Sequence, residues 1–236
     1  IKNSDYLSTI TLISMLFFIL YIISKPLFIK NKNVQNWGAM KYPQLILGMI
    51  AIFCYVGVEV TIQSNLGALL NTDAFGNISA AENSHFIAMY WGSLMIGRWL
   101  GAISIFNPSK ITKNILYVLV PFIAFSIVLF FINLRGSSIN SLKLFSICII
   151  IQILGFLLGQ NKPVKTLFIF SILATISMVY GILNTGTVSI YAFLSGGLFC
   201  SIMWPCIFSL SIAGLKKYTS QGSSFLIMMI LGGAII

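Results

Sequence analysis

One carboxylate interrupts an otherwise apolar run of the chain. The run reads IFCYVGVEVTIQSNLG over residues 52–67, and Glu59 lies inside it. At helical spacing Tyr55, Glu59 and Gln63 share one face, each four residues from the next. A carboxylate within a membrane span costs roughly 2.5–3.5 kcal/mol on insertion scales, so its presence calls for a reason. Because desolvation favours the neutral form of a carboxyl group, we expect Glu59 to be able to take up a proton.

Further polar side chains follow Glu59 along the same segment. Six of the eleven residues from 55 to 65 are polar, and Asn65 is the last of them. This density is typical of a helix that lines a water-filled cavity, and we expect the SNLG segment to loosen the helix there. The alternative is a structural role, in which Glu59 stays protonated and hydrogen-bonded to a neighbouring helix.

Two other apolar segments carry residues suited to a solute pathway. Arg98 lies in the cytoplasmic half of residues 86–106, where it either forms part of an inner gate or reaches the membrane surface as a snorkelling side chain. Trp204 precedes Pro205 within residues 188–212. We expect the proline to kink this helix and the indole ring to face the cavity, although tryptophan also serves simply to fill a core.

The elements that position these residues are membrane-spanning helices. The chain is 58% hydrophobic and only 8% charged, which is too apolar for a soluble domain. Its apolar segments are solid blocks of about 20 residues, the length of a transmembrane helix, and do not alternate as barrel strands do. We therefore predict an all-α polytopic membrane protein. The expected spans are residues 6–24, 44–66, 86–106, 115–133, 142–159, 165–183 and 188–212, with a truncated eighth from residue 223.

The net charge of +10 is spread over short connections and forms no patch for nucleic acid. Ten lysines fall in alternate connections, whereas the other connections and the N-terminus hold only Lys2, Arg135 and Lys143. By the positive-inside rule the lysine-rich connections are cytoplasmic. The connection with Asp73 and Glu82 has no basic residue and should face outward.

Cysteine and histidine usage indicates neither a metal site nor a cofactor. Cys54, Cys148, Cys200 and Cys206 lie in apolar segments without a CxxC pair, so we expect small core residues and no disulfide framework. His85 stands at the outer end of a span and is expected to be an interface residue. A Ser/His pair, an HExxH motif and paired carboxylates are all missing from the sequence, which argues against an enzyme.

Three stretches resemble a known family of transporters. They are FCYVGVEVTIQSNLGALL, YWGSLMIGRWLGAI and GLFCSIMWPCIFSLSIAGLKKYTSQGSSFLIMMILGGAII. Together they resemble the fucose–galactose–glucose:proton symporter family of the major facilitator superfamily, with the greatest likeness to bacterial glucose/galactose transporters. The last stretch, residues 197–236, is the most specific. The resemblance covers residues 43–236 well, and residues 1–42 only as a helix and a linker.

The resemblance implies two six-helix bundles. Residues 1–25 would be the last helix of the N-terminal bundle, residues 26–43 the central cytoplasmic linker, and residues 44–236 the C-terminal bundle. Residues 142–183 would then be an extra inserted hairpin. If this hairpin is peripheral, deleting residues 140–186 should leave sugar specificity intact. Because the chain starts with Ile and its final apolar block SSFLIMMILGGAII is short, we expect an internal piece of a longer protein.

The implied function is import of a hexose (glucose, galactose or fucose) with a proton, by alternating access across the bacterial plasma (inner) membrane. The partners would be the monosaccharide, the proton, the lipid bilayer and the N-terminal bundle. The expected contacts to sugar or proton are Glu59, Gln63 and Asn65, then Tyr55 and Trp204, with Arg98 at the gate. The family's usual coupling carboxylates lie in the N-terminal bundle, and fucose-transporting relatives have glutamine at position 59, so Glu59 could instead accept a sugar hydrogen bond. A uniporter, or a transporter-derived sensor without flux, remains the alternative.

Overall fold

The computed structural model describes residues 35–236 apart from 107, 137, 138, 160 and 161, together with residues 10, 13, 14, 17 and 21. Most of the predicted helix of residues 1–25 and the first half of the predicted linker of residues 26–43 therefore lie outside the described residues. Within the described part, every regular element is a helix. The predicted all-α class is confirmed.

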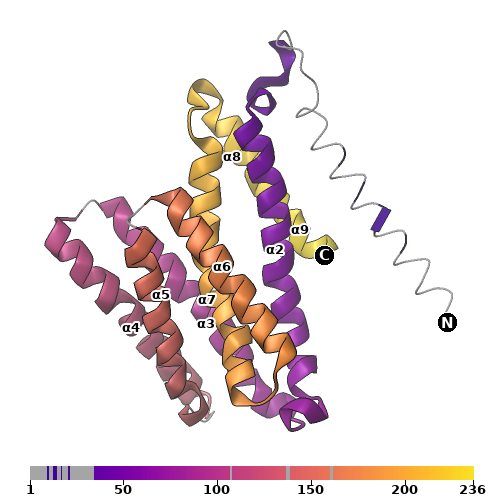
Figure 1. Ribbon diagram of the computed structural model, residues 1–236, viewed down its shortest axis with the longest axis vertical. Coiled ribbons are helices and arrows are strands. Elements are labelled where there is room, and N and C mark those ends of the chain that lie inside the picture. Colours follow the sequence, from indigo (N-terminus) through magenta and orange to yellow (C-terminus); the bar gives the residue numbers. More distant parts are fainter. Residues whose placement is uncertain are drawn as a thin grey trace. The chain divides into compact units, whose positions relative to one another are not determined.

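Long helices account for most of the described chain (Figure 1). Among the described residues, five helices are long and apolar enough to cross a membrane, and α3 is not among them because it is less apolar. Short 3-10 helices, including η1 (Gln35–Lys41) and η4 (Asn140–Phe145), lie between the longer ones. The α-helices are α2 (Pro43–Leu70), α3 (Ala80–Ala102), α4 (Lys110–Leu134), α5 (Ser146–Gly159), α6 (Pro163–Leu183), α7 (Thr187–Ile212), α8 (Thr219–Met228) and α9 (Gly232–Ile235).

Helix α3 begins six residues before the predicted span of residues 86–106 because its first turn is capped by polar side chains. The backbone N–H of Glu82 donates to the Ser79 hydroxyl, and the Glu82 carboxylate accepts from the Ser79 backbone N–H in return. This capping box satisfies two of the backbone N–H groups that a helix start leaves without partners. Asn83 then donates from Nδ2 to the carbonyl oxygen of Gly67, 3.0 Å away, and so joins α3 to the end of α2.

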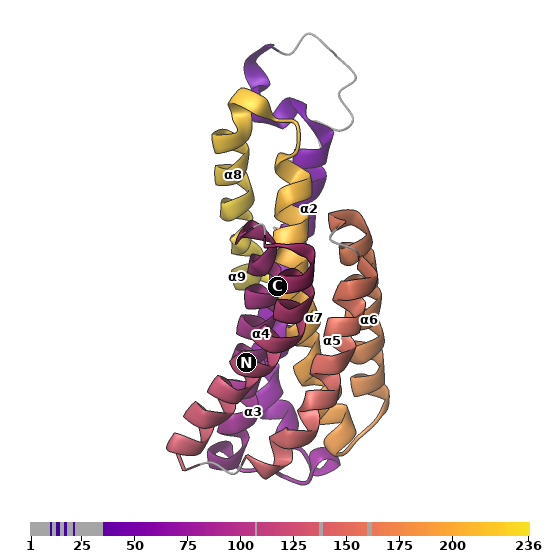
Figure 2. The same cartoon turned by 90° about the vertical axis from the view of Figure 1, so that its left-hand side faces the viewer.

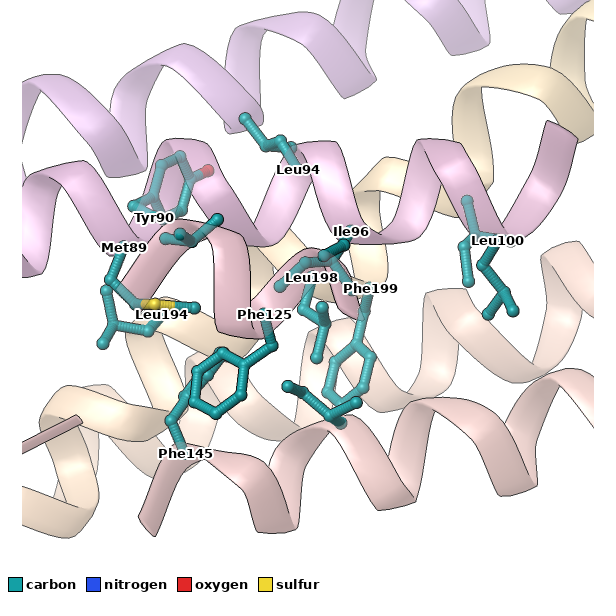
Figure 3. Close-up of a cluster of buried hydrophobic side chains, with 14 of the residues drawn as sticks. Met89, Tyr90, Leu94, Ile96, Leu100, Phe125, Phe145, Leu194, Leu198 and Phe199 are labelled. Carbon is teal, nitrogen blue, oxygen red and sulfur yellow. The ribbon is translucent and has the colours of Figure 1, made fainter. Parts of the chain in front are cut away.

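The chain divides into two compact units. The first unit comprises Ile1–Val60 and Ile207–Ile236, and the second comprises Thr61–Cys206. The core of the second unit is built from large apolar side chains of several helices (Figure 3). Tyr90 of α3, Phe125 of α4, Phe145 of η4 and Phe199 of α7 are all buried in it.

The predicted hairpin of residues 142–183 is present as α5 and α6, but it is not peripheral. Phe145, Ile149 and Ile153 precede or belong to α5 and are buried in the same core as α3, α4 and α7. Phe170 of α6 is fully buried there as well. One face of each helix supplies core side chains, so the condition that these helices are peripheral is not met. That residues 142–183 are an insertion stays a prediction. A deletion of residues 140–186 would remove part of this core.

The first unit joins the start of α2 to α8 and α9, which lie beside it (Figure 2). Helix α8 begins at Thr219. Helix α9 begins with the glycine pair Gly232 and Gly233, which packs tightly against α2. A β-carbon placed on Gly232 would lie 2.0 Å from the carbonyl oxygen of Phe53, and only a glycine allows that approach.

A polar contact holds the end of the linker against α8. The backbone N–H of Ala39 donates to Oε1 of Gln221, 2.9 Å away. Gly38 precedes it with a φ of +52°, in the left-handed region that favours glycine. The ammonium group of Lys41 lies 5.0 Å from the ring centre of Tyr218, a cation–π contact that strengthens the same junction.

Candidate functional site

Tyr55 and Glu59, which the helical spacing places on one face, are in contact and buried on α2. The Tyr55 side chain is 6% exposed and the Glu59 side chain 9% exposed. The hydroxyl of Tyr55 donates a hydrogen bond to Oε2 of Glu59 across one helical turn. The i to i+4 spacing found in the sequence thus produces a direct contact, and it gives a buried carboxyl group a donor that lessens the cost of burial.

The rest of the polar segment stays within a regular helix. Helix α2 continues without interruption to Leu70, so the expectation that SNLG loosens the helix is wrong. Asn65 is exposed and donates from Nδ2 to the carbonyl oxygen of Thr61, 2.8 Å away. The side-chain amide of Asn65 therefore adds a hydrogen bond to the helix backbone and does not interrupt the helix. Gln63 is half-buried and, by helical spacing, follows Glu59 on the same face.

Trp204 and Arg98 lie on other helices. Trp204 is half-buried on α7, and this helix extends on both sides of Pro205. Arg98 is exposed on α3. Their roles as a ring facing the cavity and as a gating residue stay predictions, as does the kink at Pro205.

The structure also reveals a buried polar side chain that the sequence analysis did not single out. Gln152 of α5 is fully buried, and its Nε2 donates to the carbonyl oxygen of Leu198, 3.3 Å away. Its Oε1 has no hydrogen-bond partner among the described residues. A β-carbon on Gly97 would lie 2.8 Å from this amide, so α3 approaches it closely. The signal in the sequence is a lone amide within the apolar run CIIIQILGF.

His85 occupies the outer end of α3, ahead of the apolar residues 86–106. It is half-buried, its Nε2 lies 3.3 Å from the hydroxyl of Ser141, and its ring packs on Phe86 with centroids 4.1 Å apart. Its position at the membrane interface stays a prediction. Burial lowers the pKa of His85 below its ordinary value of 6.5, and the nearby Glu82 carboxylate offsets part of that effect.

This lowered pKa predicts an acid-sensitive contribution to stability. In the unfolded chain His85 takes up its proton near pH 6.5, whereas in the folded chain it does so at lower pH. The unfolded state therefore binds more protons as the pH falls below about 6.5, and stability decreases over that range. We expect the melting temperature of the whole protein in detergent to fall less between pH 7.5 and 5.5 in His85→Gln than in the wild type. An equal fall in both would contradict the assignment to His85.

The cysteines only partly match their expected burial. Cys200 and Cys206 are buried as predicted, and Cys148 is intermediate. Cys54 is exposed, so its prediction as a core residue was wrong. Its neighbours in the sequence, Phe53 and Tyr55, are buried. All four are free thiols. In the part of the chain that the structure describes, His, Cys, Asp and Glu form no group of three that could hold a metal ion.

The fold and the composition together define a multi-pass α-helical membrane protein. Its long helices expose apolar side chains, and one of them carries a buried carboxyl group hydrogen-bonded to a tyrosine. Because burying a polar group without a partner is costly, the hydrogen bond from the tyrosine hydroxyl lowers the cost of burying this carboxyl group. Intramembrane ionisable groups of this kind are typical of ion and substrate pathways.

Sequence comparisons place the chain close to bacterial sugar transporters. It is 29% identical over 202 residues to a glucose/galactose transporter of Brucella abortus, covering 86% of this chain and 36% of that protein. It is 27% identical over 233 residues to a Helicobacter pylori protein provisionally named a glucose/galactose transporter, covering 98% of this chain and 44% of that protein. It is 35% identical over 80 residues to the L-fucose-proton symporter of Escherichia coli K12, covering 34% of this chain and 18% of that protein.

These comparisons confirm the resemblance to sugar transporters that the motifs predicted. The relatives are named as transporters and not as enzymes. No family model and no solved structure matched the chain. The chain spans well under half the length of the glucose/galactose transporters it matches.

Proposed function

We propose that the whole protein, to which residues 44–236 would contribute the C-terminal bundle, carries a hexose across the bacterial plasma membrane together with a proton. The observation that supports this most is the buried Glu59 with its Tyr55 partner on α2. The names of the relatives support a sugar as the substrate, and the L-fucose-proton symporter among them supports the proton. Glucose, galactose and fucose are the candidate sugars.

Glu59 would act by changing its charge during the transport cycle. An ionised carboxylate is disfavoured in a closed apolar bundle, whereas the protonated group can be buried more easily. A proton or sugar shifts a conformational equilibrium only by its different affinity for the two states. Coupling therefore requires that sugar and proton together stabilise the occluded state more than either does alone.

The remaining predicted site residues have roles that match their chemistry. The amide groups of Gln63 and Asn65 can donate to and accept from sugar hydroxyls. The indole of Trp204 offers a flat apolar face on which a sugar ring can stack. Arg98 lies on the predicted cytoplasmic half of α3, where a gate would close. The N-terminal bundle would provide the other side of the binding cavity, as in transporters built from two related halves.

Uptake into vesicles tests the proposal. The whole protein is reconstituted, and uptake of labelled glucose, galactose and fucose is measured with and without an inward proton gradient. We expect the gradient to drive accumulation of at least one of these sugars above its external concentration. Equilibration that does not respond to the gradient would indicate the uniporter instead, and the lack of any flux would indicate the sensor.

Removing the tyrosine hydroxyl tests the Tyr55–Glu59 contact. We expect Tyr55→Phe to lower the initial rate of proton-driven uptake about fivefold, which corresponds to a hydrogen bond of about 1 kcal/mol. Tyr180→Phe on α6 is the matched control, because it removes an exposed hydroxyl from the same kind of residue. Equal rates in both variants would show that the contact with Glu59 does not take part in transport.

A further inference from the structure

A groove lies between α3 and α4, two helices of the second unit that pack against each other (Figure 1). It has a volume of about 410 Å³. We call it the α3–α4 groove; its lining includes Ala88, Trp91 and Met95 of α3 and Ile127 and Phe131 of α4, and Arg135 closes one end. Apart from this arginine, the named lining is apolar.

The close approach of the two helices forms the floor of this groove. A β-carbon on Gly92 of α3 would lie 2.5 Å from Cγ1 of Val128 on α4, so a larger residue at position 92 would push the helices apart. The walls are large side chains that remain accessible. Trp91 is 52% exposed and Phe131 is 61% exposed. The groove is therefore open to the surface of the helix pair. Its lining residues extend over two helical turns of α3, about 10 Å.

The position of Arg135 places a positive charge where lipid headgroups lie. Helix α4 is one of the helices long and apolar enough to cross a membrane, and Arg135 directly follows its last residue, Leu134. The charge pattern puts this end of α4 on the outward side, where Lys2 and Lys143 are the only other basic residues. Tryptophan is also enriched at this depth, and Trp91 lines the same groove.

We propose that the α3–α4 groove binds an anionic phospholipid, with one acyl chain along the groove and the phosphate at Arg135. The apolar lining excludes a sugar, and it matches a hydrocarbon chain. The single cation at the end of the groove matches a headgroup of net negative charge, because a guanidinium can donate two hydrogen bonds to one phosphate. This inference requires only that α3 and α4 lie in a bilayer, and it does not depend on which solute the protein carries.

Photolabelling of the whole protein tests whether an anionic headgroup binds at Arg135. The purified protein is reconstituted with phosphatidylglycerol that carries a diazirine on one acyl chain, and labelled peptides are identified by mass spectrometry. We expect label on α3 and α4 at the groove. Because a basic residue near a membrane surface contributes about 1 kcal/mol of attraction to anionic lipid, Arg135→Gln should weaken labelling about fivefold. Lys143→Gln, which removes an exposed basic residue from η4 outside the groove, should leave the labelling unchanged.

A second pair of variants tests whether an acyl chain occupies the α3–α4 groove. Ala88→Leu narrows the α3–α4 groove and should reduce labelling. Ser126→Leu enlarges a side chain of α4 that lines a neighbouring hollow and not the groove, and it should leave labelling unchanged. Three results would each overturn the proposal: equal labelling by a phosphatidylcholine probe of the same chain, equal labelling of wild type and Arg135→Gln, or crosslinks in this groove to a second copy of the protein instead of lipid.

Discussion

The variant Glu59→Gln of the whole protein is expected to lose sugar accumulation driven by a proton gradient, down to the level of vesicles without protein. Glutamine has nearly the same shape and can still accept a hydrogen bond from Tyr55, but it cannot take up a proton. Exchange of labelled for unlabelled sugar should continue, because exchange needs no net proton movement. The measurement is uptake and exchange in the same preparation of vesicles.

The matched control is Glu82→Gln, which neutralises an exposed glutamate at the start of α3. It should keep gradient-driven uptake. If Glu59→Gln loses both uptake and exchange while the protein stays folded, Glu59 is a sugar acceptor and not the proton carrier. Unchanged gradient-driven uptake in Glu59→Gln would give this residue a purely structural role.

The variant Gly232→Ala should destabilise the first unit strongly. The added β-carbon would lie 2.0 Å from the carbonyl oxygen of Phe53, far inside van der Waals contact. Since the atom it meets is backbone, no side-chain rotation relieves the clash, and α9 must move away from α2. We expect a loss of about 3 kcal/mol or more, at the upper end of the usual range for overpacking. Heating the detergent-solubilised whole protein and following the monodisperse fraction by size exclusion measures it.

Gly101→Ala is the control for this prediction. Gly101 also lies in a helix, but a β-carbon there would have its nearest contact, Cγ of Pro205, at an ordinary 3.6 Å. Alanine also has the better helix propensity, so this variant should be as stable as the wild type or more stable. Equal melting behaviour of Gly232→Ala and Gly101→Ala would show that α9 does not approach α2 as the structure describes.

The helices were well predicted because their apolar length is a local property of the sequence. The expected spans 44–66 and 188–212 correspond to α2 (Pro43–Leu70) and α7 (Thr187–Ile212). The largest shift in a helix start among the long helices is at α3, whose start is set by the Ser79 capping box and not by hydropathy. A capping box is formed by polar residues, so the pattern of apolar residues does not indicate where it lies.

Tertiary packing accounts for what the sequence did not reveal. The spacing of Tyr55 and Glu59 predicted that they share a face because both lie on one helix, and the structure adds the hydrogen bond between them. Gln152 is buried because α3 and α7 pack against α5 around it. The sequence near Gln152 therefore does not show whether its side chain is buried or exposed. The same reasoning applies to the core side chains that residues 142–183 contribute. A resemblance to a family indicates which segments are additional, but it does not show which of their faces are buried.

The central claim is that Glu59 takes up a proton together with each sugar that the whole protein carries. It is tested most directly by adding sugar to lightly buffered vesicles that contain the protein, with no gradient imposed, and following the external pH. The account predicts that the medium becomes more alkaline when a transported sugar is added to the wild type, and that Glu59→Gln gives no such change while still exchanging sugar. Alkalinisation at the same rate in Glu59→Gln would contradict it.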